Sequence, residues 1–238
     1  MAELAVFYML HCSRNFKLVQ KLYRDDYRFA KFNVEKHELN GKTLGLIGVG
    51  NIGGLVAKKA ALGFDMKVIA FDPYAKELPD YIEVAESREE VFEKADYVSL
   101  HVPATPETVN SVREKEFRLM KPTAFLINTS RGSVVDEEAL IRALNEKEIA
   151  GAALDVLKQE PIDKDNPLLE MDNVVTAPHI GAATKEASAR ASLICAQGID
   201  DYLSGWKPEF VVPPMRDMVK QEGWAGKGQA EQTDKAGE

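Results

Sequence analysis

The chain has 238 residues, 45% hydrophobic and 29% charged, so it can bury a sizeable core as one large domain or two small ones. Its net charge of −8, with no basic run, argues against a nucleic-acid-binding surface. Two cysteines, Cys12 and Cys195, are too few for a disulfide framework, and the apolar opening is too short to cross a bilayer, so a cytoplasmic protein with no membrane contact is predicted.

The first forty residues differ in character from the rest of the chain. Residues 2–23 have the apolar spacing of a helix, with basic residues in the second half. Residues 24–40 are polar and aromatic and are expected to wrap a surface before a sheet begins.

From residue 41 onward, predicted strands alternate with predicted helices. The strands are rich in Val, Ile, Leu and Ala, which is typical of strands buried on both faces. This rhythm predicts an α/β fold, a Rossmann-like doubly wound parallel sheet. Strands are predicted at 43–48, 67–71, 97–101, 124–128, 151–155 and 173–177, and helices at 51–62, 88–94, 115–119 and 137–145.

The last part of the chain predicts one long helix and then little structure. The helix covers residues 185–203 and ends at Ser204-Gly205. Residues 207–214 are extended and contain prolines, and residues 215–238 have almost no aliphatic side chains, which is typical of a disordered tail. There is no repeat of solenoid length.

A glycine motif, G-x-G-x-x-G, comes after the first predicted strand as Gly48, Gly50 and Gly53. The first glycine permits a tight turn, the second lets the backbone approach a pyrophosphate, and the third lets helix and strand pack closely. Asp72 ends the next strand about twenty residues further on, where an acid meets a ribose hydroxyl. The same glycines also occur in β-α-β turns with an empty pocket, but strand, helix and acid together favour a dinucleotide site.

Three polar residues, Arg131, Glu160 and His179, come after later strands, so all three can collect along the carboxyl edge of the sheet. Hydride transfer to a ketone leaves negative charge on its oxygen, which a histidine can protonate near neutral pH. A carboxylate beside that histidine favours the imidazolium, and an arginine offers a fork of donors to a substrate carboxylate. Taken singly, each residue also has an explanation without catalysis. Arg131 can form a surface ion pair, Glu160 can belong to a solvated acidic loop, and His179 can be a hydrogen-bonded loop histidine.

Four segments, GKTLGLIGVGNIGG, LHVPATPET, LINTSRGSVVDEEAL and APHIGAAT, resemble the nucleotide-binding domain of the D-isomer-specific 2-hydroxyacid dehydrogenases. The resemblance covers roughly residues 2–212 and implies that Arg131, Glu160 and His179 are catalytic. His101 is interpreted as a packing or turn residue rather than as a second acid. The resemblance implies NAD contacts, with Asp155 at the nicotinamide carboxamide, from Gly48, Gly50, Asn51, Ile52, Gly53, Asp72, Val102, Pro103, Thr108, Thr129, Ser130, Arg131, Asp155 and His179.

The resemblance also implies the cofactor, the substrate and the partner. No arginine comes after Asp72, which favours NAD over NADP, and no metal is expected. The substrate is a small 2-hydroxy or 2-oxo acid. AELAVFYMLHCSRN and KPEFVV favour phosphoglycerate dehydrogenase-like members, and hence serine biosynthesis, with a homodimer formed through the first helix.

The resemblance divides the chain into four parts and suggests a missing segment. Residues 1–40 correspond to a crossover helix and dimer arm, 41–183 to the NAD-binding domain, 184–214 to a return helix and extended segment, and 215–238 to a tail. About a hundred family residues that form the substrate domain would precede Met1, where relatives often have valine. A GTG codon is translated as valine inside a gene and as methionine at a start, so Met1 can correspond to that valine. We therefore expect a truncated gene model or an engineered boundary.

Two other functions remain open from the sequence. The family includes corepressor-like proteins, so the chain can be an NAD-binding regulatory module. It can also be an inactive fragment, because a lid that excludes water and fixes geometry is worth several orders of magnitude in rate.

Overall fold

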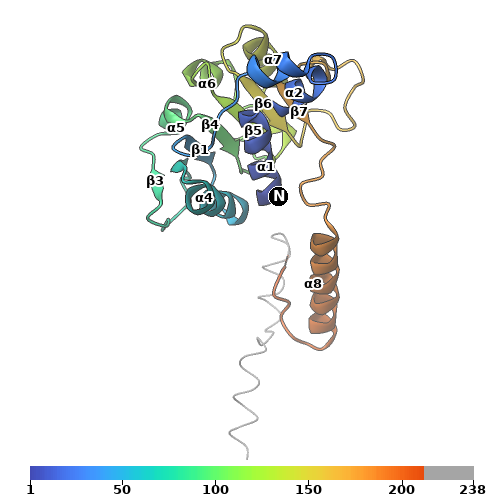
Figure 1. Cartoon of the computed structure of the whole chain (residues 1–238). Helices are drawn as coiled ribbons and strands as arrows, with labels where there is room; N and C mark the ends of the chain where they lie inside the picture. The colour runs from blue at the N-terminus through green and yellow to red at the C-terminus, as the bar shows by residue number, and fades with distance from the viewer. Residues whose placement is uncertain (212–238) are drawn as a thin grey trace, which may run out of the picture. The chain divides into compact units, whose positions relative to one another are not determined.

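A computed structural model describes residues 1–211 of the chain. Its backbone contacts divide it into one compact unit of residues 1–181 and a second unit that begins at Ala182. The first unit holds the whole sheet (Figure 1). The division of the chain into four parts stays a prediction.

The sheet has seven parallel strands in the order β3-β2-β1-β4-β5-β6-β7. The expected α/β fold with a doubly wound parallel sheet is confirmed, and each of the six predicted strands is present to within one residue at either end. The strands are β1 Thr43–Ile47, β2 Lys67–Phe71, β3 Ile82–Val84, β4 Tyr97–Leu100, β5 Phe125–Asn128, β6 Gly151–Leu154 and β7 Val174–Thr176.

Several helices begin where a short polar side chain accepts a bond from a backbone amide of the first turn. Ser87, Asp136 and Thr184 act in this way for α5, α7 and α8. The helices are α1 Ala2–Ser13, α2 Phe16–Leu22, α3 Tyr27–Phe32, α4 Asn51–Phe64, α5 Arg88–Lys94, α6 Glu114–Leu119, α7 Glu137–Asn145 and α8 Lys185–Leu203, with 3-10 turns at Gly132–Val134 and Pro167–Leu169.

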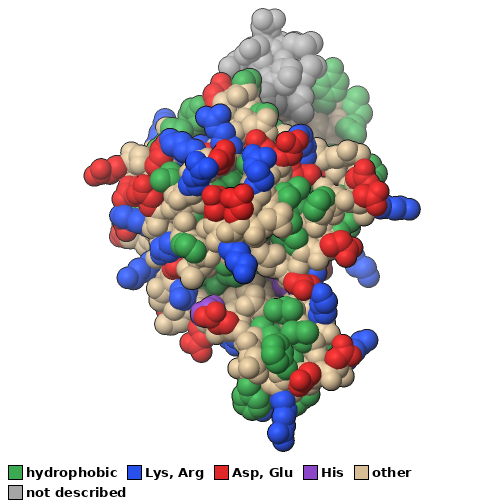
Figure 2. Space-filling model, turned by 90° about the horizontal axis from the view of Figure 1, so that it is seen from above, with side chains coloured by type: hydrophobic (Ala, Val, Ile, Leu, Met, Phe, Trp, Pro, Cys, Tyr) green, Lys and Arg blue, Asp and Glu red, His purple; other side chains and the backbone are tan. Residues whose placement is uncertain are grey.

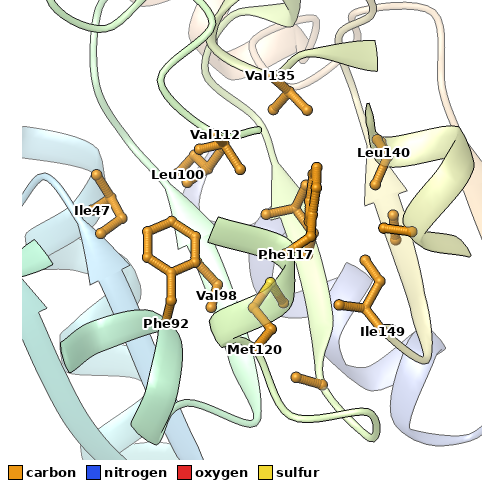
Figure 3. Packing of buried hydrophobic residues seen from close by; sticks show 14 of the residues in the cluster. Ile47, Phe92, Val98, Leu100, Val112, Phe117, Met120, Val135, Leu140 and Ile149 are labelled. Atoms are coloured by element: carbon orange, nitrogen blue, oxygen red, sulfur yellow. The ribbon is translucent and has the colours of Figure 1, made fainter. Parts of the chain in front are cut away.

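Successive strand residues enter two different hydrophobic clusters, as the period of two in a strand requires. Val98 and Leu126 join α5, α6 and α7 on one face, where Phe92 and Phe117 are fully buried (Figure 3). Phe125 and Ile127 join α1 and α4 on the other face. Burial on both faces explains why these strands read as nearly continuous apolar runs.

The prediction of one helix over residues 2–23 is wrong, because the chain turns at Asn15. Asn15 adopts a left-handed conformation with φ of 46°, which asparagine tolerates better than most residues. Helix α2 is then held by Lys17, whose Nζ donates to the carbonyls of Leu169, Met171 and Val174 at 3.3, 2.7 and 2.8 Å.

The segment 24–40, expected only to wrap a surface, contains helix α3. Asp26 caps it by accepting from the Phe29 amide at 2.8 Å. The sequence also missed β3, an edge strand of three residues in which Glu83 and Val84 are exposed, so it lacks a buried apolar run.

The predicted bounds of the long helix, 185–203, agree with those of α8, and Gly205 comes after it with φ of +76°. Residues 207–211 form no helix or strand, as expected for an extended segment. Residues 212–214 of that segment and the tail predicted as disordered, 215–238, lie outside the described residues.

Charges of both signs are interspersed over the surface seen in Figure 2. The thiols of Cys12 and Cys195 are both free, the first buried and the second exposed. Within residues 1–211, none of the helices combines the length and the apolar character needed to cross a bilayer.

Candidate active site

The order of the strands reverses between β1 and β4, and ligands of open α/β sheets bind at such a point, outside the carboxyl ends of the strands. The loops after these two strands touch. Gly48 has φ of +92°, and a Cβ on it would lie 2.6 Å from the carbonyl oxygen of His101. Only glycine fits there, so Gly48 brings the two loops together.

The other two glycines of the motif differ in what surrounds them. A Cβ on Gly53 would lie 2.3 Å from the carbonyl oxygen of Gly48, so Gly53 is needed where α4 meets the turn. A Cβ on Gly50 would meet no atom within 4 Å. Helix α4 begins at Asn51 with no side-chain cap, so its first turn is next to this open space, and the phosphate contacts expected of Asn51 and Ile52 stay a prediction.

Asp72 comes directly after β2 and lies against the glycine loop. Its carboxylate accepts from the amide of Val49 at 2.8 Å and from the amide of Tyr74 at 2.9 Å. The acid predicted to meet a ribose is therefore held next to the turn predicted to meet the phosphates.

The loop after β4 is closed by Thr108. Its hydroxyl donates to the carbonyl of Pro103 at 2.5 Å and accepts from the amide of Thr105 at 2.8 Å, which shapes the turn that carries Val102 and Pro103.

His101 begins the same loop and faces inward. Its Nε2 lies 2.9 Å from the Ser99 hydroxyl, and burial lowers the pKa of His101 to about 4. It is neutral at pH 7, which favours the packing role over that of a second acid.

The loop after β5 is organised by Asn128, a residue that sequence reasoning used only to end a strand. Its Oδ1 accepts from the amide and hydroxyl of Ser130 at 3.0 and 2.8 Å, and its Nδ2 donates to the carbonyl of Arg131 at 3.0 Å. The Arg131 guanidinium donates to the Ser130 carbonyl at 2.7 Å. The hydroxyl of Thr129 is buried without a partner in the part of the chain that the structure describes.

Glu160 and His179 meet directly, with 2.9 Å between the glutamate Oε2 and the imidazole Nδ1. Both side chains are 42% exposed, so their attraction is partly screened by solvent. Since Nδ1 faces the carboxylate, Nε2 is the ring nitrogen on the far side. The sequence analysis predicted this pair, whose two residues are nineteen positions apart in the chain.

Asp155 comes directly after β6 and holds the loop that carries His179. Its carboxylate is fully buried and accepts from the amides of Ile180 and Gly181, each at 2.8 Å. The amide of His179 donates to the Asp155 carbonyl at 2.8 Å. These three hydrogen bonds fix the position of the loop that carries His179. The nicotinamide contact expected of Asp155 stays a prediction.

The loop that carries Arg131 packs through its backbone against the loop that leads to Glu160. A Cβ on Gly132 would lie 1.9 Å from the carbonyl oxygen of Leu157, so the arginine loop rests on the loop that leads to Glu160. A cavity of about 460 Å³ opens beside this group, and its lining is mostly apolar: Leu157, Glu160, Pro161, Ile162, Leu169, Thr176, Ala177, Pro178 and His179.

Comparison with protein families identifies the family to which the chain belongs. Residues 6–181 match the model of the D-isomer specific 2-hydroxyacid dehydrogenase, NAD binding domain. The chain belongs to this family. Its sheet, glycine loop and adjoining edge are therefore those of an NAD-binding domain.

Relatives of the family resemble the chain over part of their length. The D-3-phosphoglycerate dehydrogenase of Methanocaldococcus jannaschii is 42% identical over 215 residues, which cover 89% of this chain and 40% of that protein. A glyoxylate reductase of Korarchaeum cryptofilum is 43% identical over 192 residues, covering 78% and 54%. The chain thus spans about half the length, or less, of these curated relatives.

Solved structures of the family have the same fold. A D-isomer specific 2-hydroxyacid dehydrogenase from Lactobacillus delbrueckii ssp. bulgaricus, in an NAD complexed form, superposes with a TM-score of 0.78 at 32% identity, covering 87% of this chain and 67% of that one.

The residues of this NAD-binding domain suit the cofactor. The space at Gly50 is open, and α4 begins beside it without a side-chain cap. Among the described residues, the buried Thr129 hydroxyl at the same edge has no hydrogen-bond partner. Both a pyrophosphate and a ribose are groups that such donors bind.

Proposed function

We propose that the protein is an NAD-dependent oxidoreductase that interconverts a 2-hydroxy acid and a 2-oxo acid at the CH–OH group. One observation carries the proposal: the Glu160–His179 pair stands at the same edge of the sheet as the glycine loop. A proton donor and a nucleotide site would therefore lie at the same edge of the sheet.

NAD would be held by the residues of the two loops at the strand reversal and by the loop after β5. The amides of Asn51 and Ile52 would bind its phosphates, Asp72 would bind its adenosine ribose, and Thr129 would donate its hydroxyl. When bound, NAD supplies or accepts the hydride. The carboxylate of Asp72, with no arginine after it, favours NAD over NADP.

His179 would move the proton. In the reducing direction its Nε2 donates a proton to the carbonyl oxygen that gains negative charge, and in the oxidising direction the same nitrogen removes that proton. Glu160, on Nδ1, orients the ring and leaves Nε2 for the substrate. Arg131 would bind the substrate carboxylate with its planar fork of donors.

The substrate would be hydroxypyruvate, glyoxylate or an acid similar to 3-phosphoglycerate. Similarity to a D-3-phosphoglycerate dehydrogenase and to glyoxylate reductases supports this range. The first of these would place the reaction in serine biosynthesis. Free thiols at Cys12 and Cys195 support a cytoplasmic location.

A homodimer through the first helices is part of the proposal. Several large apolar side chains of α1, α2 and α3 are exposed, and a second copy would remove them from water. They are Phe7, Phe16, Tyr27, Phe29 and Phe32. Light scattering coupled to gel filtration tests this state, and a single mass of one chain would contradict it.

The test of the function is a titration of NADH fluorescence together with assays on hydroxypyruvate, glyoxylate and phosphohydroxypyruvate. We expect NADH to bind and one of these acids to be reduced, and we expect His179→Ala to abolish the reduction while NADH still binds. Binding without turnover of any acid would contradict the enzyme and favour the regulatory module. Failure to bind NADH would leave an inactive fragment.

A further inference from the structure

The loop that carries Glu160 is fastened to the first residue of α7. The carboxylate of Glu137 accepts from the backbone amide of Lys158 at 3.0 Å and from the side-chain amide of Asn166 at 2.9 Å. Lys158 lies shortly before Glu160 and Asn166 lies six residues after it. One carboxylate therefore closes this loop at both ends.

Each end of the loop is also joined to the protein interior. Asn166 accepts from the Leu168 amide at 3.0 Å, and Leu168 is fully buried in the core. At the other end, Leu157 is buried, and the backbone of Gly132 packs against its carbonyl group. Glu137 links these two anchored ends, so the path of the loop between them is restricted.

Glu160 uses its two oxygens in two directions. Oε1 accepts from the Leu157 amide at 3.3 Å, and Oε2 faces the imidazole of His179 at 2.9 Å. The orientation of this carboxylate depends on where the loop backbone lies. A shift of the loop by about one ångström would lengthen one bond or the other beyond hydrogen-bonding distance.

We propose that Glu137 is a positioning residue for the Glu160–His179 pair. It fixes the loop at Lys158 and Asn166, and through the loop it fixes the Glu160 carboxylate on the Nδ1 of His179. The importance of this contact for turnover rests on the proposed function, whereas the contact itself does not.

The start of α7 does not explain the position of Glu137. Asp136 caps that helix by accepting from the Ala139 amide at 3.1 Å, so the cap is already supplied. A carboxylate in the first turn also favours the helix dipole, but Glu138 has the same advantage and is exposed. Glu138 is therefore a matched control, in the same helix and with the same charge.

The first experiment observes the histidine ring without requiring turnover. In protein labelled with ¹⁵N-histidine, Glu160→Gln defines the ring signal of His179 when it has lost its carboxylate. We expect Glu137→Gln to move the His179 signal toward that reference, because glutamine can accept only one of the two bonds. Amide exchange at Lys158 should be about tenfold faster, and Glu138→Gln should change neither.

The second experiment is a double-mutant cycle on turnover, which separates positioning from general stability. Glu137→Gln should lower kcat about tenfold, with the Kd for NADH changed less than about twofold. In a Glu160→Gln background the same substitution should have no further effect, because the group it acts through is gone. A merely structural role would produce the same loss in both backgrounds and would overturn the proposal.

A second variant, Asn166→Ser, tests the same contact from the other side. If Glu137→Gln fails to fold, Asn166→Ser removes the donor to Glu137 while a hydroxyl oxygen still caps the Leu168 amide, and it should move the His179 signal in the same direction. An unchanged His179 signal in the folded variants would overturn the proposal. If no acid is turned over, the ring signal still decides, so failure of the proposed function is distinguishable.

Discussion

The two ends of the candidate site are built by different means. At the glycine end, between β1 and β4, the important groups are backbone amides, and the sequence contributes mainly by omitting side chains at Gly48, Gly50 and Gly53. At the proposed catalytic end, beyond β5, β6 and β7, Glu160 meets His179 from a separate loop, and the carboxylate of Glu137 binds the loop of Glu160. The first end should be broken by adding a carbon atom where the turn is tight, and the second by separating the loops that bring Glu160 to His179.

The largest effect is expected at Gly48. Gly48→Ala would place a Cβ 2.6 Å from the His101 carbonyl oxygen in a left-handed conformation, so we expect a loss of about 2–4 kcal/mol of unfolding free energy. Urea denaturation measures it. Gly63→Ala, in α4 where a Cβ would meet nothing, should leave stability unchanged or slightly raised. Equal stability of the two variants would contradict the prediction.

Gly132 should produce a large effect at the proposed catalytic end. Gly132→Ala would drive a carbon atom into the Leu157 carbonyl and separate the arginine loop from the glutamate loop. We expect turnover to fall about a hundredfold, which corresponds to about 2.7 kcal/mol, with a smaller loss of NADH affinity because Thr129 of the same loop is proposed to bind NAD. Steady-state kinetics and NADH fluorescence test this split. A parallel loss of both would mean that the two ends are not independent.

Gly50 should separate folding from binding at the glycine end. A Cβ there meets no protein atom, so Gly50→Ala should melt within about 4 °C of the unmodified chain, the small loss being that of alanine at the N-cap of α4. The methyl group would occupy the space in which a pyrophosphate is expected, and NADH affinity should fall about tenfold. Calorimetry and fluorescence titration check the two halves of the prediction, and unchanged affinity would show that the cofactor lies elsewhere.

The last prediction concerns pH and His101, the inward-facing histidine of the loop after β4. Burial lowers the pKa of His101 from 6.5 to about 4, so the folded chain binds its proton less readily than the unfolded chain. The stability this group contributes is complete above pH 6.5 and is lost as pH falls toward 4, with about 2 kcal/mol lost at pH 5. His101→Gln should lose less stability between about pH 7 and pH 5, measured by urea denaturation. Parallel pH curves would refute this.

Local patterns in the sequence predicted much of the fold. The bounds of α8 and the positions of six strands come from apolar spacing and from turn residues such as Ser204 and Gly205, which act over a few neighbouring residues. The glycine motif could be interpreted for the same reason, because the turn, the pyrophosphate approach and the helix start are all contiguous.

Other features could not be read in this way. The break at Asn15 depends on a left-handed residue inside an apolar stretch, and β3 is an edge strand whose pairing with β2 outweighs its polar composition. Asn128 and Glu137 act on loops that lie beside them only in space. Glu137 and Lys158 are 21 positions apart, and nothing in either segment indicates the other.

Short-range spacing in the chain was thus enough to specify the sheet, the glycine loop and the polar residues that end its strands, because each of these is encoded by near neighbours. Which of those residues meet depended on tertiary packing. It set Glu160 on His179, buried Asp155 beneath the histidine loop, and joined Arg131 to its neighbours through Gly132. Hydrogen bonds over these separations depend on how loops pack, and packing is settled only when the whole chain has folded.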